Sequence, residues 1–121
     1  MASASRVEWV ARFAWLTLAC DVGVIVWSAY VRATGSGAGC GNHWPLCDGS
    51  ILPRAPQPQT VIEFLHRVTS ALALVLVASL LLRCWRKTSK GDWPRYSALL
   101  AIILLFNEAL LGGPCLCEYL A

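Results

Sequence analysis

The chain has 121 residues, of which 57% are hydrophobic and 14% are charged, with a net charge of +3. Globular domains carry about 25% charged residues, so this composition excludes an ordinary water-soluble domain and leaves a single transmembrane domain over residues 1–121. The positive excess gathers beside apolar segments, where it suits a lipid surface, so it calls for no nucleic-acid partner.

Three apolar windows predict an all-α integral membrane protein, an antiparallel bundle of transmembrane helices. They cover about residues 13–31, 60–82 and 96–113, and each comes close to the roughly 20 residues that cross a bilayer. The first window is too long for the apolar core of a signal peptide and lacks a small-residue cleavage site, so no cleaved leader is expected.

Basic residues are spread unevenly around these windows. Arg6 and Arg12 precede the first one, and the connector at 32–59 holds only Arg32 and Arg54. The connector between the second and third windows holds five: Arg83, Arg86, Lys87, Lys90 and Arg95. Because basic residues favour the cytoplasmic side, we expect a cytoplasmic N-terminus, with the 32–59 loop and the C-terminus outside. A short chain without a leader fits a prokaryotic plasma membrane.

The external loop contains a close pair of cysteines. Six residues separate Cys40 from Cys47 in the stretch CGNHWPLCDG. Outside the cytoplasm such a pair is expected to form a disulfide. It can serve as a structural staple or as a redox-active pair, and the sequence leaves both interpretations open.

The other cysteines divide by position. Cys20 in the first window and Cys84 at the cytoplasmic edge of the second are expected to be small buried hydrophobes. Cys115 and Cys117 form a tighter pair at the external end of the third window, and a disulfide between them would be strained.

The second window opens with IEFLHR, which places three functional groups on one helical face. Glu63, His66 and Arg67 stand at i, i+3 and i+4, and Glu63 precedes Arg67 in the favourable order for an ion pair. A histidine inside a span can simply form a hydrogen bond between helices. With an acid and a base beside it, His66 is also a candidate ligand or proton carrier.

Antiparallel packing would bring further charges to the same depth. Arg32 ends the first window and Glu108 lies just inside the outer end of the third, whereas Asp21 falls near the midplane. The outer third of the bundle would then hold an imidazole, two guanidiniums and two carboxylates beside apolar helices. This layer suits an amphipathic ligand with an apolar body and anionic ends.

The stretch VRATGSGAGCGNHWPLCDG followed by IEFLHR resembles the haem A synthase family of membrane enzymes. The family shows an R-x-T-G-S-G start, a C-x6-C pair enclosing Trp-Pro, and a Glu-x-x-His-Arg helix opening. The matching positions are Arg32, Thr34, Gly35, Ser36, Gly37, Cys40, Trp44, Pro45, Cys47, Gly49, Glu63, His66 and Arg67. The resemblance covers roughly residues 13–113, and its EALLGG stretch carries Glu108 where glutamine is usual.

The resemblance implies an oxidoreductase that converts the methyl group of haem O to the formyl group of haem A for terminal oxidases. Typical members have eight spans in two four-helix halves, each with a pair of haem-binding histidines, one half holding haem b and the other the substrate. This chain resembles one half without its last helix. Three alternatives then stay open: the chain is truncated, a second axial ligand comes from another subunit of a homo-oligomer, or the haem iron is held by His66 alone.

The resemblance also implies a role for each matched site residue. His66 would be an axial ligand to the haem iron, and Glu63 would be the catalytic residue that handles protons. Arg32 and Arg67 would pair with haem propionates. The loop closed by Cys40 and Cys47 would cap the porphyrin, and haem O synthase or a terminal oxidase would be partners.

Two other functions remain open from the sequence. One is a quinone-linked membrane thiol–disulfide oxidoreductase that uses the external cysteine pairs, although neither pair has CxxC spacing. The other is a non-catalytic haem-binding assembly subunit. A porphyrin spectrum would separate the first from the haem proteins, and conversion of haem O would separate an enzyme from an assembly subunit.

Overall fold

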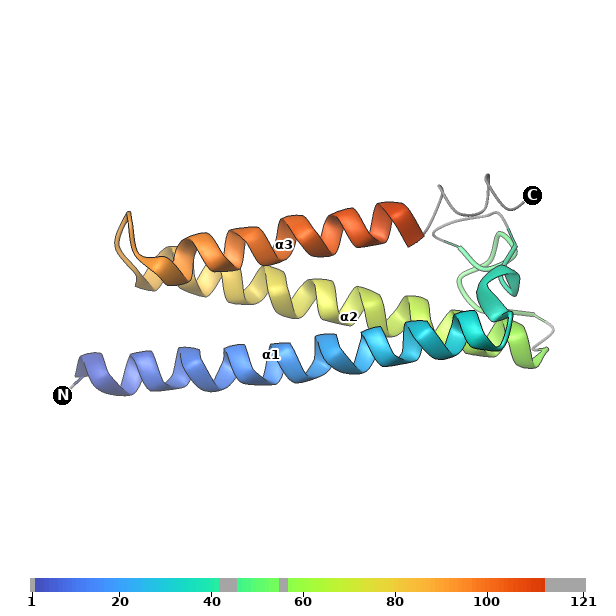
Figure 1. The fold of residues 1–121 in the computed structure, drawn as a ribbon, viewed down its shortest axis with the longest axis horizontal. Helices are drawn as coiled ribbons and strands as arrows, with labels where there is room; N and C mark the ends of the chain where they lie inside the picture. The colour runs from blue at the N-terminus through green and yellow to red at the C-terminus, as the bar shows by residue number, and fades with distance from the viewer. Residues whose placement is uncertain (1, 42–45, 55–56, 113–121) are drawn as a thin grey trace.

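The computed structural model describes residues 2–41, 46–54 and 57–112 and shows three long helices in an antiparallel bundle (Figure 1). Helix α1 (Ala2–Ala33) is followed by one turn of 3-10 helix, η1 (Ser36–Ala38). After the loop come α2 (Pro58–Lys87) and α3 (Trp93–Gly112). The expected all-α membrane bundle with three spans is confirmed.

The helices extend beyond the apolar windows at most of their ends. The segments long and apolar enough to cross a membrane are Val7–Ala33, Pro58–Lys87 and Trp93–Leu111, so the chain is a multi-pass membrane protein. Polar residues can continue a helix past the apolar part, as at Glu8 and Arg12, whose side chains form an exposed i, i+4 ion pair at 3.0 Å. Residue 113, the end of the third expected window, lies outside the described residues.

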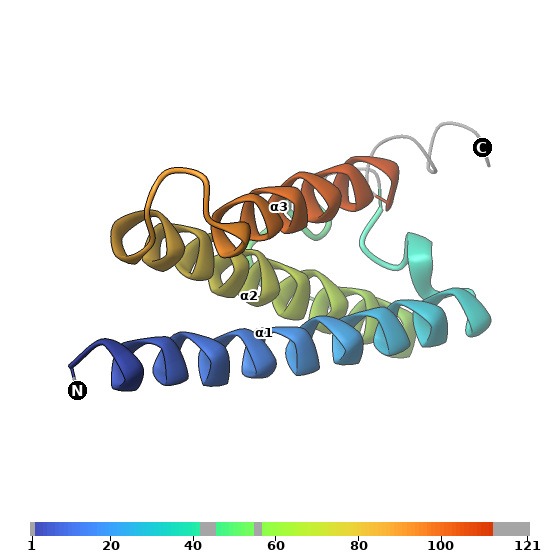
Figure 2. The same ribbon diagram turned by 60° about the vertical axis from the view of Figure 1, so that its left-hand side comes forward.

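Helix α2 lies between α1 and α3 and packs against both (Figures 1 and 2). Its buried positions beyond the loop end are small or narrow: Ala73 and Val77 in the middle of the helix and Cys84 in its last turn. Small side chains let membrane helices approach closely, whereas the large apolar side chains of all three helices are mostly exposed, as lipid contact requires. Cys84 is therefore buried as expected, but Cys20 is only half-buried because α1 contacts a neighbour along one stripe.

Two arginines stack on aromatic rings at the end of the bundle away from the cysteine loop. The Arg83 guanidinium lies 4.5 Å from the ring centre of Trp9 and 4.8 Å from that of Phe13, which joins α2 to α1. Arg95 lies 4.0 Å from the ring of Trp85, which joins α3 to α2. Cation–π contacts of this kind suit the interface between lipid and water.

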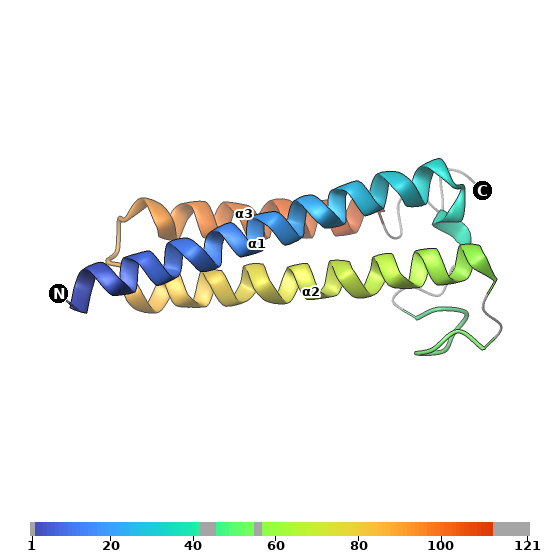
Figure 3. The ribbon, with the colours of Figure 1, turned by 90° about the horizontal axis from the view of Figure 1, so that it is seen from below.

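The TGSG stretch ends α1 and turns the chain. The Thr34 hydroxyl donates back to the carbonyl of Tyr30 at 3.0 Å, and Gly35 adopts the left-handed conformation (φ +67°) that glycine tolerates. Ser36 is fully buried and its hydroxyl lies 2.8 Å from that of Thr34. The chain thereby folds back toward the start of α2, at what we call the loop end of the bundle (Figure 3).

Candidate functional site

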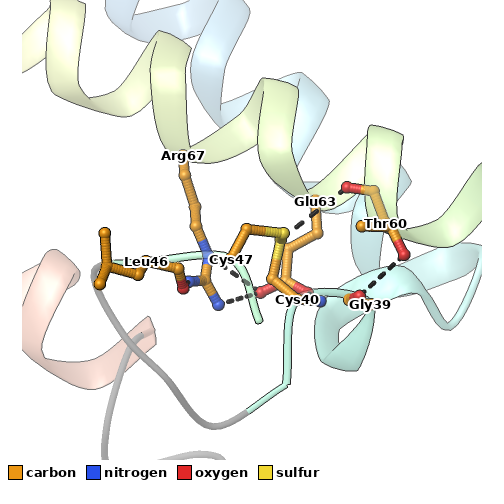
Figure 4. A network of polar contacts seen from close by, with 7 residues as sticks. All are labelled: Gly39, Cys40, Leu46, Cys47, Thr60, Glu63 and Arg67. Carbon is orange, nitrogen blue, oxygen red and sulfur yellow. Dashed lines mark hydrogen bonds and ion pairs between the residues drawn. A yellow bond between two sulfur atoms is a disulfide. The ribbon is translucent and has the colours of Figure 1, made fainter. Parts of the chain in front are cut away.

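Glu63 is the centre of a polar network at the loop end (Figure 4). It is 5% exposed, and one carboxylate oxygen accepts the backbone N–H of Cys40 at 2.6 Å. The other oxygen accepts Nε of Arg67 at 3.1 Å and also pairs with its Nη2. Arg67 uses its remaining terminal nitrogen, Nη1, to donate to the carbonyl of Leu46 at 2.7 Å. The expected ion pair forms, and it also holds the loop that contains Cys40 and Cys47.

The loop itself is closed by a disulfide between Cys40 and Cys47, whose Cα atoms lie 4.4 Å apart. Beyond Cys47 the chain makes a tight turn in which Asp48 and Gly49 both have positive φ, at 50° and 73°. Reciprocal backbone hydrogen bonds between Cys47 and Ser50 close this turn, at 3.0 and 2.9 Å. Two successive residues with positive φ favour an Asp-Gly sequence, which is the sequence found at this turn.

His66 is half-buried on α2, between Glu63 and the lipid-exposed middle of the helix. Its Nδ1 atom is buried and has no hydrogen-bond partner among the described residues. A buried imidazole nitrogen without a partner is costly, so Nδ1 calls for a hydrogen-bond partner that the described residues do not supply. Among the described residues, no three His, Cys, Asp or Glu side chains gather as a site for a bare metal ion.

Arg32 and Glu108 meet at an open cleft of about 440 Å³ on the same end of the bundle. Arg32 contributes from the last turn of α1, and α3 contributes Leu104, Asn107, Glu108 and Leu111. The cleft is apolar along part of its wall and carries a cation, an amide and a carboxylate. This chemistry suits a ligand with an apolar body and polar ends.

The structure thus divides the charged layer expected from the sequence into two parts. Glu63 and Arg67 bind each other and the loop, whereas Arg32 and Glu108 line the cleft. Asp21 lies on α1 further from the loop end, and its Oδ1 is buried without a partner among the described residues. His43 and Trp44 in the loop, and the pair Cys115 and Cys117, lie outside the described residues.

Two residues that hold the loop were not singled out from the sequence. The Thr60 hydroxyl donates to the carbonyl of Gly39 at 2.9 Å, and Gly39 lies directly on the start of α2. A Cβ atom on Gly39 would fall 2.5 Å from the carbonyl oxygen of Gln59. Thr60 sits three residues before Glu63 and therefore on the same helical face, which is the signal that could have identified it.

The sequence of the chain matches the COX15-CtaA model, described as cytochrome oxidase assembly protein, over residues 11–116. The chain belongs to this family. The match covers all of the polar network, the disulfide loop and the cleft. No solved structure shows significant similarity to the chain.

Curated relatives of this COX15-CtaA chain are longer proteins. It is 50% identical over 104 residues to a protein named Protoheme IX farnesyltransferase from Thermus thermophilus, which covers 86% of this chain and 17% of that protein. It is 38% identical over 90 residues to Heme A synthase of Shouchella clausii, and 40% identical over 90 residues to that of Bacillus licheniformis. Each of these two matches covers 74% of this chain and 30% of the relative. The chain therefore spans less than a third of these relatives.

Proposed function

We propose that this chain is a haem A synthase-type component of the membrane, which takes part in oxidising the methyl group of haem O to the formyl group of haem A. Family membership and the relatives named Heme A synthase support a role in haem A biosynthesis. The observation that carries the proposal is His66, half-buried at the loop end with a buried Nδ1 that no described residue satisfies.

The residues of the loop end fit an iron porphyrin. Neutral imidazole is a common axial ligand to haem iron, and His66 offers one at the edge of an apolar bundle. Iron porphyrin, as haem b or haem O, would supply the redox chemistry when bound. Arg32 faces an open cleft and would bind a propionate, since an exposed guanidinium suits a carboxylate.

Arg67 and Glu63 are already bonded to each other and to the loop, which limits the roles they can take beside a haem. Arg67 already donates to Glu63 and to the Leu46 carbonyl, so its contribution to a propionate would come second to that of Arg32. Oxidation of a methyl group to a formyl group, with water as the source of the oxygen atom, releases protons as well as the electrons that an electron acceptor takes up. Glu63 is the buried carboxylate nearest in sequence to His66, and we propose that it handles those protons.

A complete haem site would need groups beyond these three helices. We propose that a second axial ligand comes from another subunit of a homo-oligomer, with haem O synthase or a terminal oxidase as further partners. The basic connector between α2 and α3 supports a cytoplasmic location for that connector and for the N-terminus, in a prokaryotic plasma membrane. The Cys40–Cys47 loop would then cap the site from outside.

The test is the absorbance spectrum of the detergent-purified chain with haem, and the ratio of haem to chain. His66→Ala is expected to abolish or shift the spectrum, whereas His43→Ala is expected to leave it unchanged. Glu63→Gln is expected to keep the haem spectrum and to lose conversion of haem O. An unchanged spectrum in His66→Ala would overturn the assignment of this residue as ligand.

The family description also supports a second function, a haem-binding assembly subunit without its own catalysis. Both functions predict a haem spectrum that depends on His66. Only the enzyme predicts formation of haem A from haem O when an electron acceptor and its partners are present. A chain that binds haem through His66 and yields no haem A under those conditions would favour the assembly function.

A further inference from the structure

The loop is held on α2 at both of its cysteines. On the Cys40 side, the Thr60 hydroxyl donates to the Gly39 carbonyl at 2.9 Å, and Glu63 accepts the Cys40 amide at 2.6 Å. On the Cys47 side, Arg67 donates to the carbonyl of the preceding residue, Leu46, at 2.7 Å. Three side chains within two turns of one helix therefore hold the backbone next to each of the two cysteines that the disulfide joins (Figure 4).

The contact between loop and helix is close enough to bury the disulfide. Cys40 is 0% exposed and Cys47 is 2% exposed. The Cys40 sulfur lies 3.8 Å from the Thr60 carbonyl oxygen; since a disulfide sulfur carries no proton, this is a packing contact and not a hydrogen bond. Because both cysteines are buried, we expect a reductant to reach these sulfurs only after the loop moves.

We propose that docking of the loop on α2 and the Cys40–Cys47 disulfide stabilise each other, and that Thr60 is a positioning residue in this coupling. The disulfide holds Gly39 and Leu46 at the spacing that Thr60 and Arg67 bind. In return, the docked backbone holds the two cysteines together and shields them. Coupling of this kind is reciprocal, so weakening the docking makes the disulfide easier to reduce.

The coupling has a consequence for the site. Glu63 and Arg67 are both docking groups and flank His66 along the helix. Reduction of the disulfide would release the groups that orient these two side chains. The redox state of the outer compartment would thus change the orientation of side chains within one turn of His66, the proposed iron ligand, although neither cysteine contacts it.

The experiment is a reduction equilibrium of the full chain in detergent against a dithiothreitol redox buffer, in the absence of haem. Each disulfide reduced takes two electrons and two protons from one dithiol, which itself becomes a cyclic disulfide. Alkylation followed by peptide mass mapping reports Cys40 and Cys47 separately from the other four cysteines. The readout does not depend on activity, so it can fail while the haem proposal stands, and the reverse also holds.

Thr60→Val removes the hydroxyl at nearly constant volume. Loss of one hydrogen bond is expected to raise the equilibrium constant for reduction about 3- to 10-fold, and tenfold corresponds to about 30 mV for this two-electron couple. Thr60→Ser is expected to restore the original value. The matched control is Thr69→Val on the same helix, because the Thr69 hydroxyl bonds only to carbonyls of its own helix, those of Leu65 and His66.

An equilibrium constant unchanged in Thr60→Val, or changed equally in Thr69→Val, would overturn the coupling. If Thr60→Val does not fold, the same equilibrium is measured in Glu63→Gln. The glutamine amide can accept from Cys40 or from Arg67 but not from both, so the coupling predicts a shift in the same direction. No shift in that variant would overturn it equally.

Discussion

Arg32 on α1 and Glu108 on α3 line one cleft, although their helices are joined mainly through α2 and the described residues contain no ion pair between them. Opposite charges near a membrane normally pair or bind a ligand, because an isolated charge in an apolar setting is costly. The other arginine of the site, Arg67, is already engaged by Glu63 and Leu46. Arg67 therefore holds the loop, whereas Arg32 remains available to bind a ligand in the cleft.

Arg32→Gln is expected to weaken binding of a porphyrin dicarboxylate about tenfold with little effect on stability, since a charge-assisted hydrogen bond is lost at an exposed site. Titration of haem into the detergent-solubilised chain, followed by absorbance, measures the dissociation constant. Arg54→Gln is the control, because Arg54 is an exposed arginine in the connector between α1 and α2 and is not among the described residues that line the cleft. Equal weakening in both variants would indicate a nonspecific charge effect.

Glu63→Ala is expected to destabilise the chain by about 3 kcal/mol, because it leaves the Cys40 amide and the largely buried Arg67 guanidinium without an acceptor. Glu8→Ala provides a matched control, since Glu8 forms the same i, i+4 pair with Arg12 but both side chains are well exposed. Its cost should stay below about 0.5 kcal/mol. Unfolding in mixed detergent micelles compares the two, and similar losses would contradict a structural role for Glu63.

Gly39→Ala is expected to destabilise the docked loop by about 1–3 kcal/mol, because the added Cβ would fall within 2.8 Å of three backbone atoms of Gln59 and Thr60. Gly37→Ala, two residues earlier, places its Cβ in open space and should be tolerated. Limited proteolysis of the loop measures the difference. Equal resistance of the two variants would show that the loop can shift at this contact without losing stability.

The orientation of the chain can be tested with cysteines placed at two exposed positions, Arg54 in the connector between α1 and α2 and Lys90 in the connector between α2 and α3. With Cys115 and Cys117 replaced by Ser, an impermeant maleimide should label Arg54→Cys in intact cells. It should label Lys90→Cys only after permeabilisation, because the basic connector is expected inside. The opposite labelling pattern would invert the proposed topology.

The helical architecture could be predicted from the sequence because it depends on local periodicity and on the length of apolar runs. The Glu63–Arg67 pair was predictable for the same reason, being four residues apart on one helix. Apolar windows could not give the helix ends, since the helices continue through charged residues such as Glu8 and Arg12 in α1 and Arg86 and Lys87 in α2. The C-terminal end of α2 is instead marked by Thr88, whose backbone N–H and hydroxyl both donate to the Cys84 carbonyl, at 3.0 and 2.6 Å.

Long-range contacts of the loop were not predictable in the same way. The Cys40 amide meets Glu63 across 23 positions, and nothing in the local sequence specifies that a backbone donor will face that carboxylate. The Arg32–Glu108 cleft likewise depends on how α1 and α3 are arranged around α2. From the sequence we could infer that these charges share a depth in the bilayer. We could not infer that Glu63 and Arg67 bind the loop while Arg32 and Glu108 line an open cleft.

The distance along α2 between the polar network at the loop end and the stacked arginines at the far end sets the membrane thickness that suits the molecule. Along α2, Glu63 and Arg83 are about 20 residues apart, and at 1.5 Å per residue this spans about 30 Å, the thickness of a bilayer's hydrocarbon core. One charged layer therefore reaches one membrane surface when the other reaches the opposite surface. A markedly thinner membrane would leave Arg83 with its Trp9 ring, or the loop with its Glu63 anchor, protruding into water. A markedly thicker one would draw one of these layers into hydrocarbon, at a cost of fractions of a kcal/mol per ångström of mismatch.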